Sequence, residues 1–411
     1  MNRPRKNQST ESCADGVQLR RPLQLERKEK KKMKILITAP GNDSHTAPLK
    51  WALEQAGYSV ACWSGLGWTE AKQASISLRP DLQIEELQIK DTQMKDTQLK
   101  LGRHLVEPGD VIWVRKPAEP KPNPQTAVED AKFAANEYRS FYDSLMYLLE
   151  ALPVRVVNKY TASRFINNKS VQLLQARACG MNVPRTLMSN SPPAVRKYFG
   201  GNPQRMICKT FSTHIWEKEQ GGPVVVTETF ELSADMLPSD EVLTYAPAIY
   251  QELVVKKFDV RMVLLGAAVY SYSLHNPKGA LDWRHDATQG LLKVEAIATP
   301  PEVEKSVLEF AAKSGIACGS FDFAIDNQDR WWFLEVNEGG QFLWLDAANA
   351  GLHVQEKFLA FLTSPAGASR QMLEARQSEF PSWSDYLASP AKDQQLPEEA
   401  DPDASYVSIE A

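Results

Sequence analysis

The stretch that decides the fold is residues 320–337, which read SFDFAIDNQDRWWFLEVN. Two runs rich in apolar and aromatic residues flank a polar turn, and this pattern predicts a β-hairpin. If the hairpin is symmetric about Gln328 and Asp329, Asp322 lies directly across from Glu335. The Cβ atoms of such a cross-strand pair are about 5 Å apart, so the two carboxylates repel one another.

The facing acids indicate a metal site. Asn337 projects from the same face as Glu335 because side chains alternate along a strand. A cation would relieve the repulsion, and hard oxygen ligands with room for phosphate oxygens and water suit Mg²⁺ better than zinc. We therefore predict that Asp322, Glu335 and Asn337 bind magnesium. The alternative is a hairpin whose acids merely face solvent, against which the apolar residues beside them argue.

A magnesium site of this kind needs groups that bind phosphate. The sequence contains no GxxxxGK[ST] and no convincing GxGxxG, so side chains must meet the phosphates. Lys209 stands inside an otherwise apolar strand, where an unpaired ammonium is costly and a phosphate partner would offset that cost. The alternative is a lysine that reaches solvent from an edge strand.

Arg261 raises the same question in the strand pattern FDVRMVLL, residues 258–265. A planar guanidinium suits a transferring phosphoryl oxygen, which makes Arg261 a second candidate for the site. A simple ion pair with Asp259 is the alternative.

The bulk composition is ordinary for a globular protein: of 411 residues, 43% are hydrophobic and 24% charged. No run of about 18 apolar residues could span a membrane, and residues 1–13 lack the apolar stretch of a secretory signal. The five cysteines form no close pair and leave one over, which argues against a disulfide framework. We therefore expect a cytoplasmic protein with no membrane partner.

The two ends of the chain carry opposite charge. Residues 1–32 hold ten Lys or Arg against four acids. No aromatic residue is interleaved with these charges, so we expect a disordered basic tail rather than a nucleic-acid-binding arm, and Met33 is an alternative start. The last 21 residues hold six acids against Lys392, and residues 366–411 carry little pattern. We expect a partly disordered acidic tail there.

The chain between the tails predicts an α/β part followed by an α+β part. Strand patterns at residues 34–38, 58–63, 110–115 and 154–158, with helices at 47–56 and 128–152, predict a small α/β layer. A helix at 168–178 ends before Gly180. The remainder is rich in strands, at MICKTF, VVVTETF, AIYQELV, DVRMVLLG, AVYSYSL, FDFAID and RWWFLEVN.

These residues carry a family resemblance over about residues 150–365. The order and approximate spacing resemble those of ATP-grasp carboxylate ligases at Lys169, Lys209, residues 251–254, Asp259, Arg261, Asp322, Glu335 and Asn337. The resemblance implies that Lys169 and Lys209 hold the α and β phosphates of ATP and that Arg261 meets the γ phosphate. Gln251 and Glu252 with the backbone of Val254 would lie at the adenine, and the metal trio would hold two Mg²⁺ ions, with Mn²⁺ as an alternative.

A narrower resemblance, to the microviridin-type (graspetide) peptide-cyclising ligases, extends over about residues 33–365. It rests on residues 113–117, 168–176, 183–187, 282–284 and 335–344, the last reading EVNEGGQFLW. It implies a pre-ATP-grasp domain at 33–158, a first ATP-grasp lobe at 159–248 and a second lobe with the metal site at 249–365. Two features depart from the family: the loop after Lys209 is not glycine-rich, and Glu338 adds negative charge beside the metal trio.

The implied reaction has two steps. A carboxylate of the substrate attacks the γ phosphate of ATP, and an amine or hydroxyl then displaces phosphate from the acyl phosphate. Lys209, Arg261 and Arg284 are the catalytic candidates, with Arg284 nearest the substrate carboxylate, whereas an ion pair between Asp282 and Arg284 is equally compatible with the sequence. His275 and His285 are candidate bases, although each is more often an ordinary surface histidine.

The partner implied is a ribosomally made precursor peptide, or another carboxylate substrate, closed by ester or amide bonds; a homodimer is an option. One alternative function is a RimK-like ligase that adds an amino acid to a protein or small molecule. Another is a regulator that binds ATP without catalysis. We predict that Asp322→Asn or Lys209→Met abolishes ATP-dependent modification and leaves the fold intact.

Overall fold

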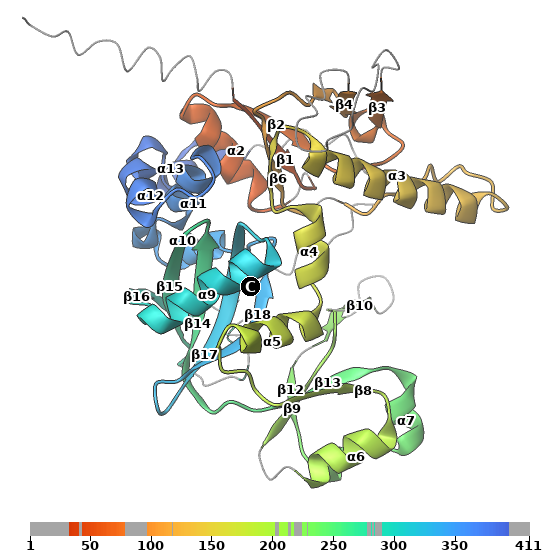
Figure 1. Cartoon of the computed structure of the whole chain (residues 1–411), viewed down its shortest axis with the longest axis vertical. Coiled ribbons are helices and arrows are strands. Elements are labelled where there is room, and N and C mark those ends of the chain that lie inside the picture. Colours follow the sequence, from red (N-terminus) through yellow and green to blue (C-terminus); the bar gives the residue numbers. More distant parts are fainter. Residues whose placement is uncertain are drawn as a thin grey trace, which may run out of the picture.

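The computed structural model describes residues 33–40, 43–78, 97–116, 118–201, 205–212, 215–217, 224–227, 229–277, 281, 283 and 290–393. Several sequence predictions lie outside these residues: the basic tail, most of the 82–100 segment, the end of the acidic tail, and Asp282, Arg284 and His285. Figure 1 shows the sheet of β1, β2 and β6, the sheet of β14–β18 and the sheet of β8, β9, β12 and β13 following one another along the long axis of the molecule. No helix among the described residues is long and apolar enough to cross a membrane.

The N-terminal sheet is parallel and has the strand order β2-β1-β6-β7. Its strands are β1 (Lys34–Thr38), β2 (Ser59–Trp63), β6 (Val111–Val114) and β7 (Arg155–Val157). Ile35 and Ile37 pack with helix α2 (Thr46–Gln55), and Leu36 packs with helix α3 (Ala131–Ala151), as the two-residue period of a strand requires. A small antiparallel sheet, β3 (Ala74–Leu78), β4 (Thr97–Leu101) and β5 (His104–Leu105), adjoins it. The predicted α/β layer is confirmed.

The central sheet is antiparallel, with the order β12-β9-β13-β8. It comprises β8 (Thr186–Ser189), β9 (Met206–Lys209), β12 (Phe230–Leu232) and β13 (Ala248–Glu252), with helices α6 (Pro192–Gly200) and α7 (Asp240–Tyr245). We predicted that the second lobe begins at residue 249. In the structure β13 hydrogen-bonds to β8 and β9, so the central sheet continues to Glu252. A separate pair, β10 (Ile215–Glu217) and β11 (Val224–Val226), follows β9.

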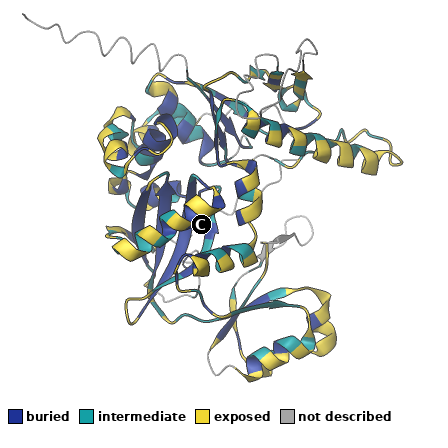
Figure 2. Cartoon of the chain, in the orientation of Figure 1, coloured by how far each residue is buried: buried dark blue, intermediate teal, exposed yellow. Residues whose placement is uncertain are grey.

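The largest sheet is antiparallel, with the order β16-β15-β14-β17-β18. Its strands are β14 (Lys256–Leu265), β15 (Ala268–His275), β16 (Lys293–Ile297), β17 (Cys318–Asp326) and β18 (Trp331–Asn337). One face packs on α4 (Tyr160–Ile166), α5 (Lys169–Ala178) and α9 (Pro301–Ser314) through residues such as Val260 and Met262. Helices α4 and α5, which fall within the lobe that we predicted at 159–248, share the core of this sheet. Figure 2 shows the sheet buried beneath its helices.

The other face of the large sheet packs on C-terminal helices that also contact the N-terminal sheet. These are α10 (Leu343–Ala348), α11 (Val354–Thr363), α12 (Arg370–Arg376) and α13 (Trp383–Ala388). Every residue of α11 except Lys357 is buried, so this helix joins the two sheets into one core. Arg155 of β7 donates to Phe361 O (3.1 Å) and Leu362 O (3.0 Å), which places a cation at the C-terminal end of α11.

The structure also differs from the sequence analysis after residue 365. We expected little regular structure there, and the chain forms short helices as far as Asp393. Helices α12 and α13 each bury a single large apolar residue, Leu373 and Tyr386, and Phe380 is buried in the connection between them, so there is no periodic apolar stripe. A helix of six or seven residues shows too few apolar positions for its period to stand out in the sequence.

Candidate active site

The β17–β18 hairpin has the predicted register at the site. Asp322 pairs with Glu335, and Ser320 pairs with Asn337. Nearer the turn the register shifts by one residue between Asp322 and Phe323, so the assumed symmetry does not hold along the whole hairpin. The predicted facing of the two acids is confirmed.

Asp322 also faces Arg261, which lies on the neighbouring strand β14. The two residues pair directly in register, and Arg261 Nη1 is 3.0 Å from Asp322 Oδ1. Arg261 is 3% exposed and Asp322 is 7% exposed, so the charges meet in the interior. Removal of either partner would leave the other charge buried without its counter-ion, which is costly in the interior of a protein. Asp259, the alternative partner that we considered, forms an ion pair with Lys256 at 2.6 Å.

Two tryptophans support the guanidinium of Arg261. The Arg261 Cζ lies 5.3 Å from the ring centroid of Trp283 and 5.5 Å from that of Trp344. The two rings stack with centroids 4.6 Å apart and planes inclined by 22°. Contacts of this kind stabilise a cation over an aromatic face. The sequence analysis missed these roles, although the DWR segment at 282–284 and the FLW segment at 342–344 were the signals.

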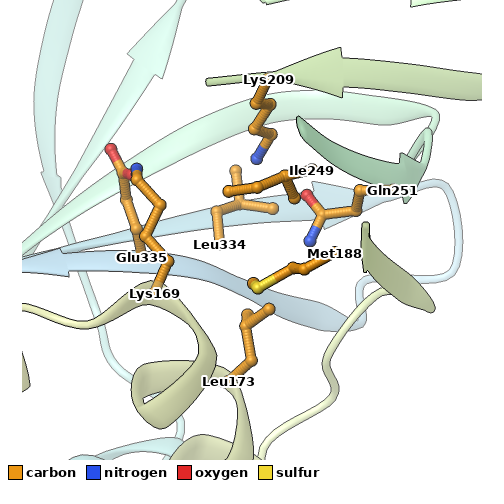
Figure 3. Close-up of a pocket in the computed structure, with 8 residues that line it drawn as sticks. All are labelled: Lys169, Leu173, Met188, Lys209, Ile249, Gln251, Leu334 and Glu335. Carbon is orange, nitrogen blue, oxygen red and sulfur yellow. The ribbon is translucent and has the colours of Figure 1, made fainter. Parts of the chain in front are cut away.

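Lys169 and Glu335 form the second ion pair of the site. Lys169 is the first residue of α5, and its Nζ donates to Glu335 Oε2 over 2.9 Å. Both side chains are about one-third exposed, at 28% and 32%. Figure 3 shows the two side chains lying side by side at one end of a cleft. The structure therefore places a predicted phosphate-binding lysine beside a predicted metal ligand.

The cleft lies between the central sheet and the large sheet. It is lined by Lys169, Leu173, Met188, Lys209, Ile249, Gln251, Leu334 and Glu335. Lys209 comes from the end of β9, where it pairs with Ile249, and Figure 3 shows its amine directed into the cleft. Each side of the cleft thus contributes one lysine together with apolar side chains, and both kinds of group are needed for the phosphates and the base of a nucleotide.

The predicted adenine-binding residues lie at and just beyond the end of β13. Gln251 is 2% exposed, and its Nε2 donates to Thr186 Oγ1 over 2.9 Å. Its Oε1 is buried without a hydrogen-bond partner among the described residues, so it is available to a donor on a ligand. Glu252 lies 3.6 Å from Arg185, and Val254 follows β13 in the connection to β14; neither lines the cleft described above.

The donor set of Asp322, Glu335 and Asn337 fits Mg²⁺ by its chemistry, since it offers two carboxylates and an amide oxygen. The structure revises one step of the sequence argument, because Arg261 and Lys169 already offset the charges of the two acids. Asn337 Oδ1 accepts from Gly339 N at 3.1 Å, which fixes the amide. Among the described residues, no group of three or more His, Cys, Asp or Glu side chains could hold a metal ion.

Two further candidates take other positions. His275 ends β15, and its ring packs 4.9 Å from that of Phe258, as a structural histidine would. Glu338 follows the metal strand, and burial raises the pKa of its carboxyl above the ordinary value although Arg115 opposes the shift. Arg284, Asp282 and His285 cannot be placed, since they lie outside the described residues.

Comparison with solved structures identifies the fold. A RiPP-associated ATP-grasp ligase of Chryseobacterium gregarium, solved with ADP and a leader and core peptide, superposes with a TM-score of 0.67 at 20% identity, over 82% of this chain and 99% of that one. The macrocyclase MdnC of Microcystis aeruginosa MRC, bound with precursor peptide MdnA, has a TM-score of 0.63 at 19% identity, over 81% and 100%. The chain has the ATP-grasp fold. The ATP-grasp ligase PsnB, solved with a precursor variant, Mg and ADP, superposes at 0.58 with 20% identity, over 80% and 97%.

The ATP-grasp fold predicted for this chain is thus confirmed, and it extends over nearly the whole length of these structures. No family model matches the sequence, and no curated protein matches it. The ATP-grasp assignment therefore rests on structure, while the roles of individual residues rest on the geometry of the cleft.

Proposed function

We propose that this protein is an ATP-dependent carboxylate ligase that forms ester or amide bonds between side chains of a ribosomally made peptide. The observation that carries the proposal is a cleft lined by Lys169, Lys209 and Glu335, in which Glu335 pairs across the hairpin with Asp322, the partner of the buried Arg261. Similar structures bear on the substrate, because those of the Chryseobacterium ligase and MdnC were solved with leader, core or precursor peptides.

In the proposed mechanism, the protein brings two anions together. Lys169 and Lys209 would neutralise the phosphates of ATP, and Gln251 Oε1 would accept from the base. Asp322, Glu335 and Asn337 would hold Mg²⁺, which when bound supplies electrostatic stabilisation of the phosphoryl group. Arg261, fixed against Asp322 and the stacked tryptophans, would face the transferring phosphoryl oxygens.

The chemistry follows the implied order. A substrate carboxylate oxygen attacks the γ phosphorus, the bond to the β-phosphate oxygen breaks, and ADP leaves. An amine or hydroxyl of the same peptide then attacks the acyl carbon, loses its proton and displaces inorganic phosphate. Each bond therefore removes one water from the peptide.

The test uses the full chain with ATP, Mg²⁺ and a synthetic peptide encoded by a short open reading frame beside the gene. The expected result is ADP release together with the loss of one water mass per bond. With free amino acids added, a gain of one amino-acid residue mass, which is the amino acid less one water, would support the RimK-like alternative. If the protein binds ATP but forms no ADP in the presence of the peptide, the proposal is overturned and a non-catalytic ATP-binding regulator is favoured.

We also propose where the protein is located and how its assembly can be tested. We propose a reduced, cytoplasmic setting, supported by the free thiols of Cys62, Cys179, Cys208 and Cys318. A homodimer is tested by light scattering on the full chain, where the mass of a single chain at working concentration would exclude it.

A further inference from the structure

The loop between β18 and α10 is held by side chains from the N-terminal sheet. Arg115, just after β6, donates from Nη1 to Gly339 O over 3.0 Å, and Asn158, just after β7, donates from Nδ2 to Glu338 O over 2.7 Å. A Cβ added at Gly339 would lie 3.1 Å from Arg115 O and 3.3 Å from its Nη1. The loop that follows the metal strand therefore packs tightly against a different domain.

His45 completes this attachment from the start of α2. Its Nε2 accepts from the backbone N–H groups of Phe342 (3.0 Å) and Leu343 (3.2 Å), where α10 begins. The imidazole also packs edge-on against the Phe342 ring, with centroids 5.1 Å apart. Because N–H groups at the start of a helix lack intrahelical partners, His45 satisfies two buried donors at once.

The contacts around His45 require a neutral ring. Since Nε2 accepts twice, the single proton of a neutral imidazole is on Nδ1, where Ser44 Oγ lies 3.2 Å away and can accept it. The guanidinium of Arg115, held by Asp43 at 3.3 Å, also comes within 3.3 Å of Nδ1; because a guanidinium can only donate, this contact is not a hydrogen bond when Nδ1 carries the proton. Protonation would turn the acceptor into a donor that faces two N–H groups beside a fixed cation.

The segment that His45 fixes leads directly into the active site. Trp344 follows Leu343 without a break, stacks on Trp283 and lies against Arg261. Arg261 in turn pairs with Asp322. One imidazole in the N-terminal domain is thus connected, through one residue of backbone and one indole ring, to the buried charge pair of the site.

We propose that His45 is a positioning residue for the active site, which as a neutral acceptor fixes the start of α10 and thereby the contact of Trp344 with Arg261. This inference rests on the proposed function in that Arg261 acts on phosphate. It gives the N-terminal domain a part in catalysis, although none of its residues lines the cleft described above.

The experiment compares three variants of the full chain. His45→Leu removes the acceptor, whereas His45→Gln keeps a neutral amide oxygen that can accept at the position of Nε2. Leu49→Ala is the matched control, because Leu49 is fully buried in the same core but makes none of these bonds. Steady-state ADP formation and hydrogen exchange of the amides of residues 342–344 are measured, at equal folded fraction.

We expect His45→Leu to lower kcat at least about tenfold with the KM for ATP changed by less than about threefold, since Lys169 and Lys209 remain. Exchange at Phe342 and Leu343 should accelerate in this variant, and His45→Gln should restore both measurements in part. Leu49→Ala should change neither.

Three results would overturn the proposal: an unchanged kcat in His45→Leu, an equal loss in Leu49→Ala, or equal losses in the Leu and Gln variants. The exchange measurement separates this inference from the proposed function. If the wild type forms no ADP, the proposed function fails, yet slow exchange in the wild type and fast exchange in His45→Leu would still demonstrate that His45 holds the start of α10.

Discussion

Lys169 and Glu335, 166 residues apart in the sequence, form an ion pair of 2.9 Å at the end of the cleft. The pair joins a proposed phosphate ligand to a proposed magnesium ligand. Binding of Mg²⁺ and ATP would therefore exchange one set of charge partners for another, with the ammonium turning to phosphate and the carboxylate to the metal. This exchange limits how much each isolated charge costs before substrates bind.

Replacement of the ammonium should separate the two roles. In Lys169→Met we expect the dissociation constant for ATP to rise about tenfold, because a phosphate contact is lost. We also expect Mn²⁺ to bind more tightly without nucleotide, because Glu335 loses a competing cation. Isothermal titration would measure both affinities. Lys257→Met is the control, since Lys257 forms an ion pair of similar length, 2.7 Å, on an exposed part of the same sheet; equal effects of the two variants would refute the assignment.

The buried pair changes what Asp322→Asn should do. The sequence alone predicted loss of the reaction with an intact fold, but Arg261 would keep its charge in the interior without its carboxylate partner. We expect turnover to fall by about 100-fold or more and the free energy of unfolding to fall by about 2–4 kcal/mol. Urea denaturation would measure the second effect.

Glu335→Gln is the comparison for that experiment, because its side chain is 32% exposed. It should lose turnover to a similar degree while the urea midpoint changes little. A variant Asp322→Asn as stable as Glu335→Gln would contradict the structural role of the buried pair.

The stacked tryptophans should matter for turnover more than for nucleotide binding. In Trp344→Ala, Arg261 loses one aromatic contact at 5.5 Å, and we expect kcat to fall about tenfold with a smaller change in the KM for ATP. Trp68→Ala removes an indole that is 41% exposed and serves as the control. Steady-state measurement of ADP release gives kcat and the KM for ATP of both variants. A wild-type kcat in Trp344→Ala would show that Trp344 does not position Arg261 for turnover.

His45 should make stability depend on pH. Burial, and to a smaller extent the positive charge of Arg115, lowers the pKa of His45 well below 6.5. Two acids also lie close to Arg115: Asp43, which forms an ion pair with it, and Glu338. The unfolded chain then binds the proton more readily, so the stability that His45 contributes is complete above about pH 7.5 and falls as the pH drops below about 6.5. Relative to His45→Gln, the free energy of unfolding of the wild type should fall by about 1.4 kcal/mol for each pH unit between about pH 6.5 and the lowered pKa of the folded protein. Urea denaturation between pH 5 and 8 tests this, and a difference independent of pH would contradict it.

Local patterns account for the elements that sequence reasoning predicted. β1 has the predicted bounds, Lys34–Thr38, and the pairing of Asp322 with Glu335 follows from a turn of a few residues. The shift of register beyond Asp322 was not predictable, because a bulge depends on packing rather than on the turn. Helix α9 carries proline at its start and Gly315 in the left-handed region (φ 75°) at its end, signals that were present in the sequence, although we made no prediction there.

By itself the sequence determined the strand-rich architecture and, through the two-residue period of the hairpin, which acids and amide share a face. The tertiary structure alone decided that Lys169 pairs with Glu335, that Arg261 pairs with Asp322 and lies against Trp344, and that His45 accepts from residues 297 and 298 positions later. The physical reason is that periodicity fixes neighbours within an element or a hairpin, whereas contacts between distant elements depend on how separate sheets and helices bury their apolar faces against one another.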